Sequence, residues 1–221
     1  MLSRTQAVNQ TRSEHLGGVI RNKTNKKRYF MSKLAMIMTT FVFGLTSMAC
    51  AQAQECDMNV NFETAQETGQ WRAVNDGVMG GKSSGGPRFE NGNMIFEGVI
   101  NTNGGGFSSL RSPVDKGQLK DAYALTLRVK SDGRAYKLTF RTDMTYRRRL
   151  ISFQAPIPLT PKGEWAEVSV PFSDLRGSLF GRPLQGAKFD RSQVQEMGII
   201  LADGLDGPFR LEVDWIKSCG V

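Results

Sequence analysis

Apolar and polar residues alternate with a period of two in several segments of the chain. In Ala124–Lys130 the apolar residues fall on every second position, and Tyr136–Arg141, Ala166–Val170 and Phe209–Ile216 repeat this pattern. Such alternation is typical of strands with one buried and one solvated face. The run Met197–Leu201 is apolar throughout, which predicts a central strand covered on both sides.

Less regular apolar segments add further strands to this pattern. Turn sequences such as Ser131-Asp132-Gly133 separate the segments, and no segment has ten or more residues of helical period. We therefore expect an all-β fold, a single-domain jelly roll or β-sandwich, with at most single turns of helix. The further strands are expected at Met58–Phe62, Met94–Gly98, Phe107–Arg111 and Leu150–Ala155, and the helical turns at Pro171–Leu175 and Arg191–Glu196.

Residues 1–53 differ from the rest of the chain and are interpreted as a leader. A polar, basic stretch precedes the apolar segment Leu34–Ala49, and the small-residue sequence Ala51-Gln52-Ala53 follows it. This order is typical of a secretory signal, and the apolar segment is shorter than the ~20 residues that a membrane span needs. We expect cleavage after Ala53, export to the periplasm or cell envelope of a bacterium, and one β-jelly-roll domain over residues 54–221.

Two alternatives stay open within the leader. Met31 begins a complete signal by itself, so residues 1–30 are either part of the protein or an upstream extension. The sequence Ser47-Met48-Ala49-Cys50 resembles a bacterial lipobox, with Ser in place of the usual Leu. Cys50 is therefore a candidate lipidation site, and only with that lipid do we expect the protein to be held at a membrane.

The net charge of +8 comes almost entirely from the leader. Residues 1–53 hold eight of the 29 Lys and Arg and one of the 21 acidic residues, so residues 54–221 have a net charge of only +1. A nearly neutral domain gives no global electrostatic reason to bind nucleic acid. The single histidine, His15, also lies in the leader. We therefore expect no Ser-His-Asp or Cys-His catalysis, no common zinc site and no cofactor.

Two cysteines, Cys56 and Cys219, lie at the two ends of the expected domain. In an oxidising compartment an even pair at the termini predicts a disulfide that joins the first strand to the last. In the chain-entropy model, a disulfide that closes so long a loop stabilises the folded state by on the order of 4–5 kcal/mol. The alternative is two unpaired thiols.

The region around Trp71 carries the most specific sequence motif. Together with motifs farther along the chain, it resembles the complex I intermediate-associated protein family of the thirty-kilodalton type, over essentially Phe62–Ile216. The motifs are Trp71–Ser83 (WRAVNDGVMGGKS), Phe96-Glu97-Gly98, Gly104–Arg111 (GGGFSSLR), Trp165, Val170-Pro171-Phe172, Gly198-Ile199, Asp203, Gly207-Pro208-Phe209 and Leu211–Ile216.

This resemblance implies a galactose-binding-like jelly roll and a binding role without catalysis. Mitochondrial members of the family are assembly factors for respiratory complex I and hold a membrane-arm intermediate. Those members work in the matrix, whereas the leader predicts export, so the fold and the binding character are what the resemblance implies here.

Several residues are candidates for binding, each with a structural alternative. Trp71 is either a packing residue or a stacking platform for a sugar or a partner side chain. Asn75 and Asp76 either stabilise a turn or line a site with Arg111 and Arg141. The two arginines are alternatively paired with Asp76 or Asp143.

The remaining candidates are glycines, a run of arginines and a pair of aspartates. Gly80-Gly81 and Gly104–Gly106 lack the sequence of a phosphate loop, and they either permit turns or let a ligand approach the backbone. Tyr146 and Arg147-Arg148-Arg149 are either a solvated hairpin tip or a contact for an anionic surface. Asp203 and Asp206 suggest calcium only weakly, because their spacing does not match an EF-hand, and no metal is expected.

Two binding functions follow as hypotheses, and the third hypothesis is an enzyme with paired carboxylates, for which the sequence singles out no pair. The first is an exported protein-interaction or assembly module whose partner is a protein, such as a membrane or respiratory-chain assembly intermediate. The alternative is a carbohydrate-binding module of the cell envelope, suggested by the fold and by Trp71, Trp165 and Tyr146.

Overall fold

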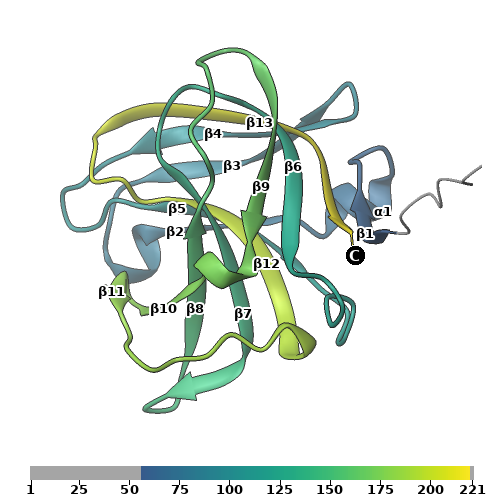
Figure 1. Cartoon of the computed structure of the whole chain (residues 1–221). Helices are drawn as coiled ribbons and strands as arrows, with labels where there is room; N and C mark the ends of the chain where they lie inside the picture. The colour runs from purple at the N-terminus through teal and green to yellow at the C-terminus, as the bar shows by residue number, and fades with distance from the viewer. Residues whose placement is uncertain (1–55, 220–221) are drawn as a thin grey trace, which may run out of the picture. The chain divides into compact units, whose positions relative to one another are not determined.

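A computed structural model describes residues 56–219, and for Cys56, Asp57 and Cys219 it describes the backbone alone. The domain is a sandwich of two antiparallel sheets (Figure 1). The first sheet has the order β3-β4-β13-β6-β9, with β1 also paired to β13, and the second has the order β11-β10-β8-β7-β12-β5-β2. An all-β sandwich is confirmed.

Thirteen strands and four short helices make up the described chain. The strands are β1 Cys56–Val60, β2 Arg72–Asn75, β3 Ser84–Glu90, β4 Asn93–Ile100, β5 Ser108–Pro113, β6 Ala124–Ser131, β7 Tyr136–Tyr146, β8 Arg149–Pro156, β9 Trp165–Pro171, β10 Arg176–Leu179, β11 Arg182–Pro183, β12 Val194–Leu201 and β13 Gly207–Cys219. The helices are α1 Ala65–Gly69, η1 Asp76–Met79, η2 Phe172–Asp174 and η3 Arg191–Gln193.

The core lies between the two sheets and takes every second side chain of the long strands. Strand β6 gives Leu125, Leu127 and Val129 to it, and β7 gives Leu138 and Phe140 from the opposite sheet. Burying such side chains is the main favourable term in folding, about 1.5–3 kcal/mol for each. The alternation in the sequence thus becomes two inner faces in contact and two outer faces in water.

The predicted strands are all present, and the predicted central strand β12 lies between β7 and β5. Strand β3 was not predicted, because its sequence SGGPRFE has two glycines and a proline. It lies at the edge of its sheet, where a missing N–H at Pro87 is tolerated. The turn predicted at Arg191–Glu196 is shorter than expected, since Val194 already begins β12.

The expected leader, with Met31, Cys50 and Ala53, lies outside the described residues, so the boundary at residue 53 stays a prediction. Within residues 56–219, no helix has the length and apolar character needed to cross a bilayer.

Candidate functional site

Asn75 and Asp76 hold two loops together at one end of the sandwich. The Asp76 carboxylate accepts hydrogen bonds from the Ser83 amide at 2.9 Å, the Ser83 hydroxyl at 2.5 Å and the Gly106 amide at 2.6 Å. The amide side chain of Asn75 donates to the Gly85 carbonyl and accepts from the Ser108 hydroxyl. Asp76 is completely buried, so its hydrogen bonds replace those it would make with water.

Opposing effects act on the pKa of Asp76. Burial raises this pKa, but the hydrogen bonds from Ser83, Gly106 and Phe107 together lower it below its ordinary value. The carboxylate is therefore ionised at neutral pH, with its charge satisfied inside the protein. The structure brings Asp76 to these loops rather than to Arg111 or Arg141, and in the described chain it makes no ion pair with either arginine.

The double and triple glycines of the motif surround this carboxylate. A Cβ atom on Gly81 would lie 2.7 Å from the Cβ of Asp76, and one on Gly105 would lie 2.6 Å from its Cγ. These two glycines are needed for space, and Gly104 and Gly106 have the positive φ that favours glycine. The glycine motif therefore serves the architecture around Asp76.

Trp71 packs in the core. Its ring centroid lies 5.8 Å from that of Phe62, and the side chain is buried. Trp165 and Trp215 lie on the outer face of the first sheet, where Arg128 and Lys217 cover their rings at 5.0 and 4.4 Å from the centroids. Trp71 is thus buried, and each of the two outward tryptophans has a cation over its ring.

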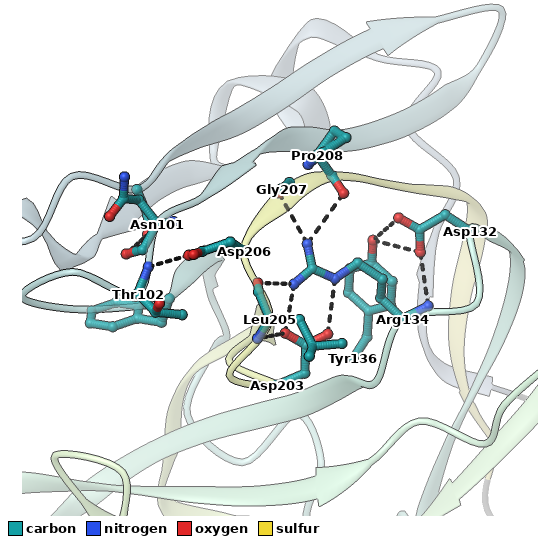
Figure 2. Close-up of polar contacts among 12 residues, drawn as sticks. Asn101, Thr102, Asp132, Arg134, Tyr136, Asp203, Leu205, Asp206, Gly207 and Pro208 are labelled. Carbon is teal, nitrogen blue, oxygen red and sulfur yellow. Dashed lines mark hydrogen bonds and ion pairs between the residues drawn. The ribbon is translucent and has the colours of Figure 1, made fainter.

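Arg134 gathers a set of oxygen atoms between two loops (Figure 2). Its guanidinium donates two hydrogen bonds to Asp203, at 2.9 and 2.6 Å, and further ones to the carbonyls of Leu205, Gly207 and Pro208. Asp206, the other suggested calcium ligand, accepts from the Thr102 amide. The two aspartates are thus used in separate interactions, and the cation next to Asp203 is Arg134.

Arginines gather around one acid on the outer face of the second sheet. Arg72, Arg111, Glu196 and Arg141 come from the consecutive strands β2, β5, β12 and β7, in that spatial order. The register places Arg72 opposite Arg111 and Arg141 opposite Glu196. Since alternate residues of a strand face the same side, all four side chains share one face. We call these four residues the arginine cluster.

The arginine cluster has more positive than negative charge. Glu196 forms ion pairs with Arg72, with Arg141 at 3.6 Å and with Arg111 at 4.0 Å. The last two distances are too long for hydrogen bonds, and among the described residues Glu196 Oε2 and Arg141 Nε have no hydrogen-bond partner. Three cations thus share one carboxylate, and part of their hydrogen-bonding capacity is unused.

The pKa of Arg111 is lowered by burial and, in addition, by this excess of positive charge. The side chain is only 12% exposed. Burial lowers its pKa to about 10, the charges of Arg141 and Arg72 lower it as well, and Glu196 acts in the opposite direction. Burial also lowers the pKa of Arg141. These arginines remain charged at neutral pH in a place where their charge is not fully compensated.

The outer face of the first sheet is different, because its charges balance. A continuous series of ion pairs across β3, β4, β13 and β6 joins three cations, Arg88, Arg210 and Lys130, to three carboxylates, Glu90, Glu97 and Glu212. Arg128 pairs with Asp214 in the same sheet. Of the two outer faces, the second sheet's is therefore the one left with uncompensated positive charge.

Sequence reasoning identified Arg111 and Arg141 but missed Glu196 and Arg72. Glu196 precedes the apolar run that forms β12, and Arg72 follows Trp71, so neither stands in an evident charged motif. Their meeting depends on the order of strands in the sheet, which the sequence does not display.

Tyr146 and Arg147 lie at the tip of the β7–β8 hairpin, away from the arginine cluster along the sheet. Tyr146 pairs with Arg149, and Arg147 and Arg148 form the two-residue turn between them. The predicted hairpin tip is therefore present. Cys56 and Cys219 are opposite residues of β1 and β13. Their side chains lie outside what the structure describes, so the disulfide stays a prediction.

Comparison with known proteins places the chain in a family. A model of the family "Complex I intermediate-associated protein 30" matches residues 60–213. The chain is 36% identical over 95 residues to "Complex I intermediate-associated protein 30, mitochondrial" of Mus musculus, which is 42% of this chain and 29% of that protein. It is 33% identical over 98 residues to "Probable complex I intermediate-associated protein 30, mitochondrial" of Caenorhabditis elegans. This match covers 42% of this chain and 28% of that protein. The matches span less than a third of the relatives' length.

A solved structure supports the fold. The family 11 carbohydrate-binding module of the cellulosomal cellulase Lic26A-Cel5E of Clostridium thermocellum has a TM-score of 0.56 with this chain, at 18% identity. The superposition covers 73% of this chain and 92% of the module. At this identity the likeness shows a shared β-sandwich fold and nothing about the ligand.

The relatives correct the expected location. The leader predicts the bacterial periplasm, whereas the curated relatives are described as mitochondrial, which points to mitochondria instead. A high content of basic residues with few acids is shared by secretory and mitochondrial targeting sequences, so the charge of residues 1–53 does not distinguish the two. The family match extends over β2 to β12 without interruption and into β13. The chain belongs to the complex I intermediate-associated protein 30 family.

Proposed function

We propose that this chain is a non-catalytic protein-interaction module that assists the assembly of respiratory complex I. We further propose that the arginine cluster receives an acidic segment of its protein partner. The observation that carries this proposal is the sharing of one carboxylate, Glu196, by Arg72, Arg111 and Arg141.

The chemistry of the arginine cluster favours a carboxylate ligand. A guanidinium offers donors in a planar fork that matches the two oxygens of a carboxylate. Arg111 and Arg141 face Glu196 at distances longer than hydrogen bonds, so their donors are available to a second acid. Burial is the main cause that lowers the pKa of Arg111, and a partner carboxylate would offset the positive charges of Arg141 and Arg72 that add to it.

The position of the cluster favours a protein rather than a small molecule. The four residues span four adjacent strands, which are ~4.8 Å apart. Three pockets of the described domain are lined by other residues, and none of the three includes Arg111, Arg141 or Glu196. A broad charged sheet face suits an extended acidic segment lying across the strands.

A carbohydrate-binding function has less support than the fold suggests. Sugar recognition on such a sheet normally needs exposed aromatic rings as platforms. Where β7, β12 and β5 of the second sheet pair with one another, the register leaves no aromatic residue at an outward position, and the exposed Tyr146 lies beyond this region at the tip of the β7–β8 hairpin. The outward residues there are Lys137, Thr139, Arg141, Glu196, Gly198, Ile200, Ser109, Arg111 and Pro113.

The test uses cells of the source organism from which the gene for this chain has been deleted. Complex I assembly is compared after complementation with each variant. Arg111→Glu combined with Arg141→Glu should leave complex I immature, seen as accumulated intermediates on native gels. Lys120→Glu combined with Lys162→Glu, at two exposed positions outside the arginine cluster, is the matched control and should restore assembly. Folding of each purified variant is checked by its unfolding curve.

Two results would contradict the proposal. Normal complex I in cells without the chain would remove the assembly role. Full complementation by the Arg111→Glu, Arg141→Glu variant would keep the assembly role but remove the arginine cluster as the binding site.

A further inference from the structure

The two-residue hairpin turns of this domain differ in their choice of residues. Asn91-Gly92 joins β3 to β4, Arg147-Arg148 joins β7 to β8, and Phe180-Gly181 joins β10 to β11. In all three turns both central residues have positive φ, between 48° and 75°. This is the backbone of a type I′ turn, for which Asn-Gly is the preferred sequence.

The chain thus uses the preferred sequence at one hairpin and departs from it at two. Arg147 and Arg148, at φ 48° and 63°, and Phe180, at φ 50°, are in a region that L residues with large side chains rarely adopt. Backbone strain at exposed positions persists where the side chains are selected for another purpose. Their location at the surface means that no packing requirement explains them.

The two unusual turns are neighbours. Strand β8 pairs with β10, and the guanidinium of Arg149 lies 5.4 Å above the ring of Phe180. Figure 1 shows the β7–β8 hairpin reaching away from the two sheets at the lower edge of the view. We call Tyr146, Arg147, Arg148, Arg149, Leu150 and Phe180 the tip cluster.

The tip cluster combines positive charge with exposed apolar side chains. Segments 144–150 and 176–183 contain five arginines and no acidic residue. In the described chain, Arg147, Arg148 and Arg149 form no ion pair. Tyr146, Leu150 and Phe180 are 40%, 45% and 61% exposed. The contact of these three side chains with water is unfavourable, and no described acidic side chain forms an ion pair with the three arginines.

We infer that the tip cluster docks the domain on a bilayer surface that contains anionic phospholipid. Arginines attract the negative surface and bind phosphates, while Tyr, Leu and Phe enter the boundary between headgroups and acyl chains. A projecting pair of hairpin turns is convex and suits a broad, deformable surface. This inference is independent of the protein partner proposed above.

The test uses the full chain and vesicles of phosphatidylcholine, with or without phosphatidylglycerol. Hydrogen–deuterium exchange should show protection of residues 144–150 and 179–182 by the anionic vesicles only, and salt should weaken it. Hydrogen exchange is measured separately for each peptide segment. Vesicle binding through residues 1–55 would therefore not produce protection of residues 144–150 and 179–182.

The informative variant is Arg147→Asn with Arg148→Gly, alone and combined with Phe180→Asn. These changes install the preferred turn sequence, so the variant should be at least as stable as the natural chain. The two arginines contribute roughly fivefold each to surface affinity, so the double variant should bind anionic vesicles on the order of 25-fold more weakly. Lys120→Asn with Lys162→Asn removes the same charge elsewhere and should bind as the natural chain does.

Three outcomes would overturn the inference. The first is that the tip segments exchange alike with and without anionic vesicles, and the second is that the turn variant retains its protection and affinity. Protection by poly-glutamate but not by vesicles would assign the tip cluster to an acidic protein instead.

Discussion

Gly105 lies so close to Asp76 that a Cβ atom added to it would be 2.6 Å from the Cγ of the carboxylate. The contact cannot be relieved by a simple rotation, because Asp76 is held by hydrogen bonds from Ser83 and Gly106. This pair of residues therefore fixes the separation of the two loops.

Substitution of Gly105 by Ala should destabilise the domain by about 2 kcal/mol, the usual cost of forcing extra volume into a packed site. Chemical unfolding at neutral pH measures the loss. Gly69→Ala is the control, because a Cβ atom there meets nothing within 4 Å. If both variants unfold at the same denaturant concentration, Asp76 does not constrain the loops as described.

Substitution of Asp76 by Asn should cost about 3 kcal/mol at neutral pH, since a buried amide nitrogen would face N–H donors. Hydrogen bonds lower the pKa of Asp76 in the folded chain below its ordinary value, despite burial. The ionised carboxylate therefore stabilises the fold at any pH above the ordinary pKa, and this stabilisation is lost as the pH falls through the lowered pKa. The difference between the natural chain and the variant should narrow in acid. Unfolding curves from pH 7 to pH 3 measure it, with exposed Asp121→Asn as control; a difference that is constant with pH would contradict the assignment.

Substitution of Arg111 by Met should stabilise the isolated domain by about 1–3 kcal/mol while weakening partner binding. The folded pKa of about 10 is below the ordinary value, so the unfolded chain holds this proton more firmly and the charged residue destabilises the fold at neutral pH. The advantage of the variant should be full below pH 10 and shrink as the pH rises above it. Thermal unfolding at pH 7 and pH 11 checks this; a less stable variant at pH 7 would show that the cluster serves stability.

A disulfide between Cys56 and Cys219 should make the oxidised chain lighter by two hydrogen atoms and more stable than the reduced chain. The two residues are opposite each other in β1 and β13, and closing the long loop is worth on the order of 4 kcal/mol. Intact mass without reductant and unfolding with and without reductant are the measurements. Cys56→Ser should match the reduced natural chain, and a Cys56→Ser variant as stable as the oxidised chain would exclude the bond.

The strands could be predicted because the core takes alternate residues. In β6 the sequence shows directly which residues lie inside, whereas in β13 the alternation holds from Phe209 to Val213 and an irregularity in register then leaves Trp215 outside and Ile216 inside. Strand β2 escaped prediction because its four residues, RAVN, are too few to display alternation. Alternation of apolar and polar residues predicts a strand only where the segment is long enough to show several repeats.

The candidate site was predicted in fragments. Arg111 and Arg141 were identified as charged residues of two separate strands, and Asp76 as a turn residue. That Glu196 joins the arginines while Asp76 joins the glycine loops follows from the order of strands in the second sheet. Since neighbouring strands there are far apart in the chain, no local spacing could show this pairing.

The arrangement around Arg134 has a consequence for how the domain depends on its surroundings. Loops that gather a carboxylate and several carbonyls about a metal ion are ordered only while the ion is bound, so their order follows its concentration. Here the charge that organises Asp203 and the carbonyls of Gly207 and Pro208 is covalently part of the chain. This charge cannot dissociate from the loops that it orders, so the arrangement of these oxygen atoms does not depend on the concentration of an ion.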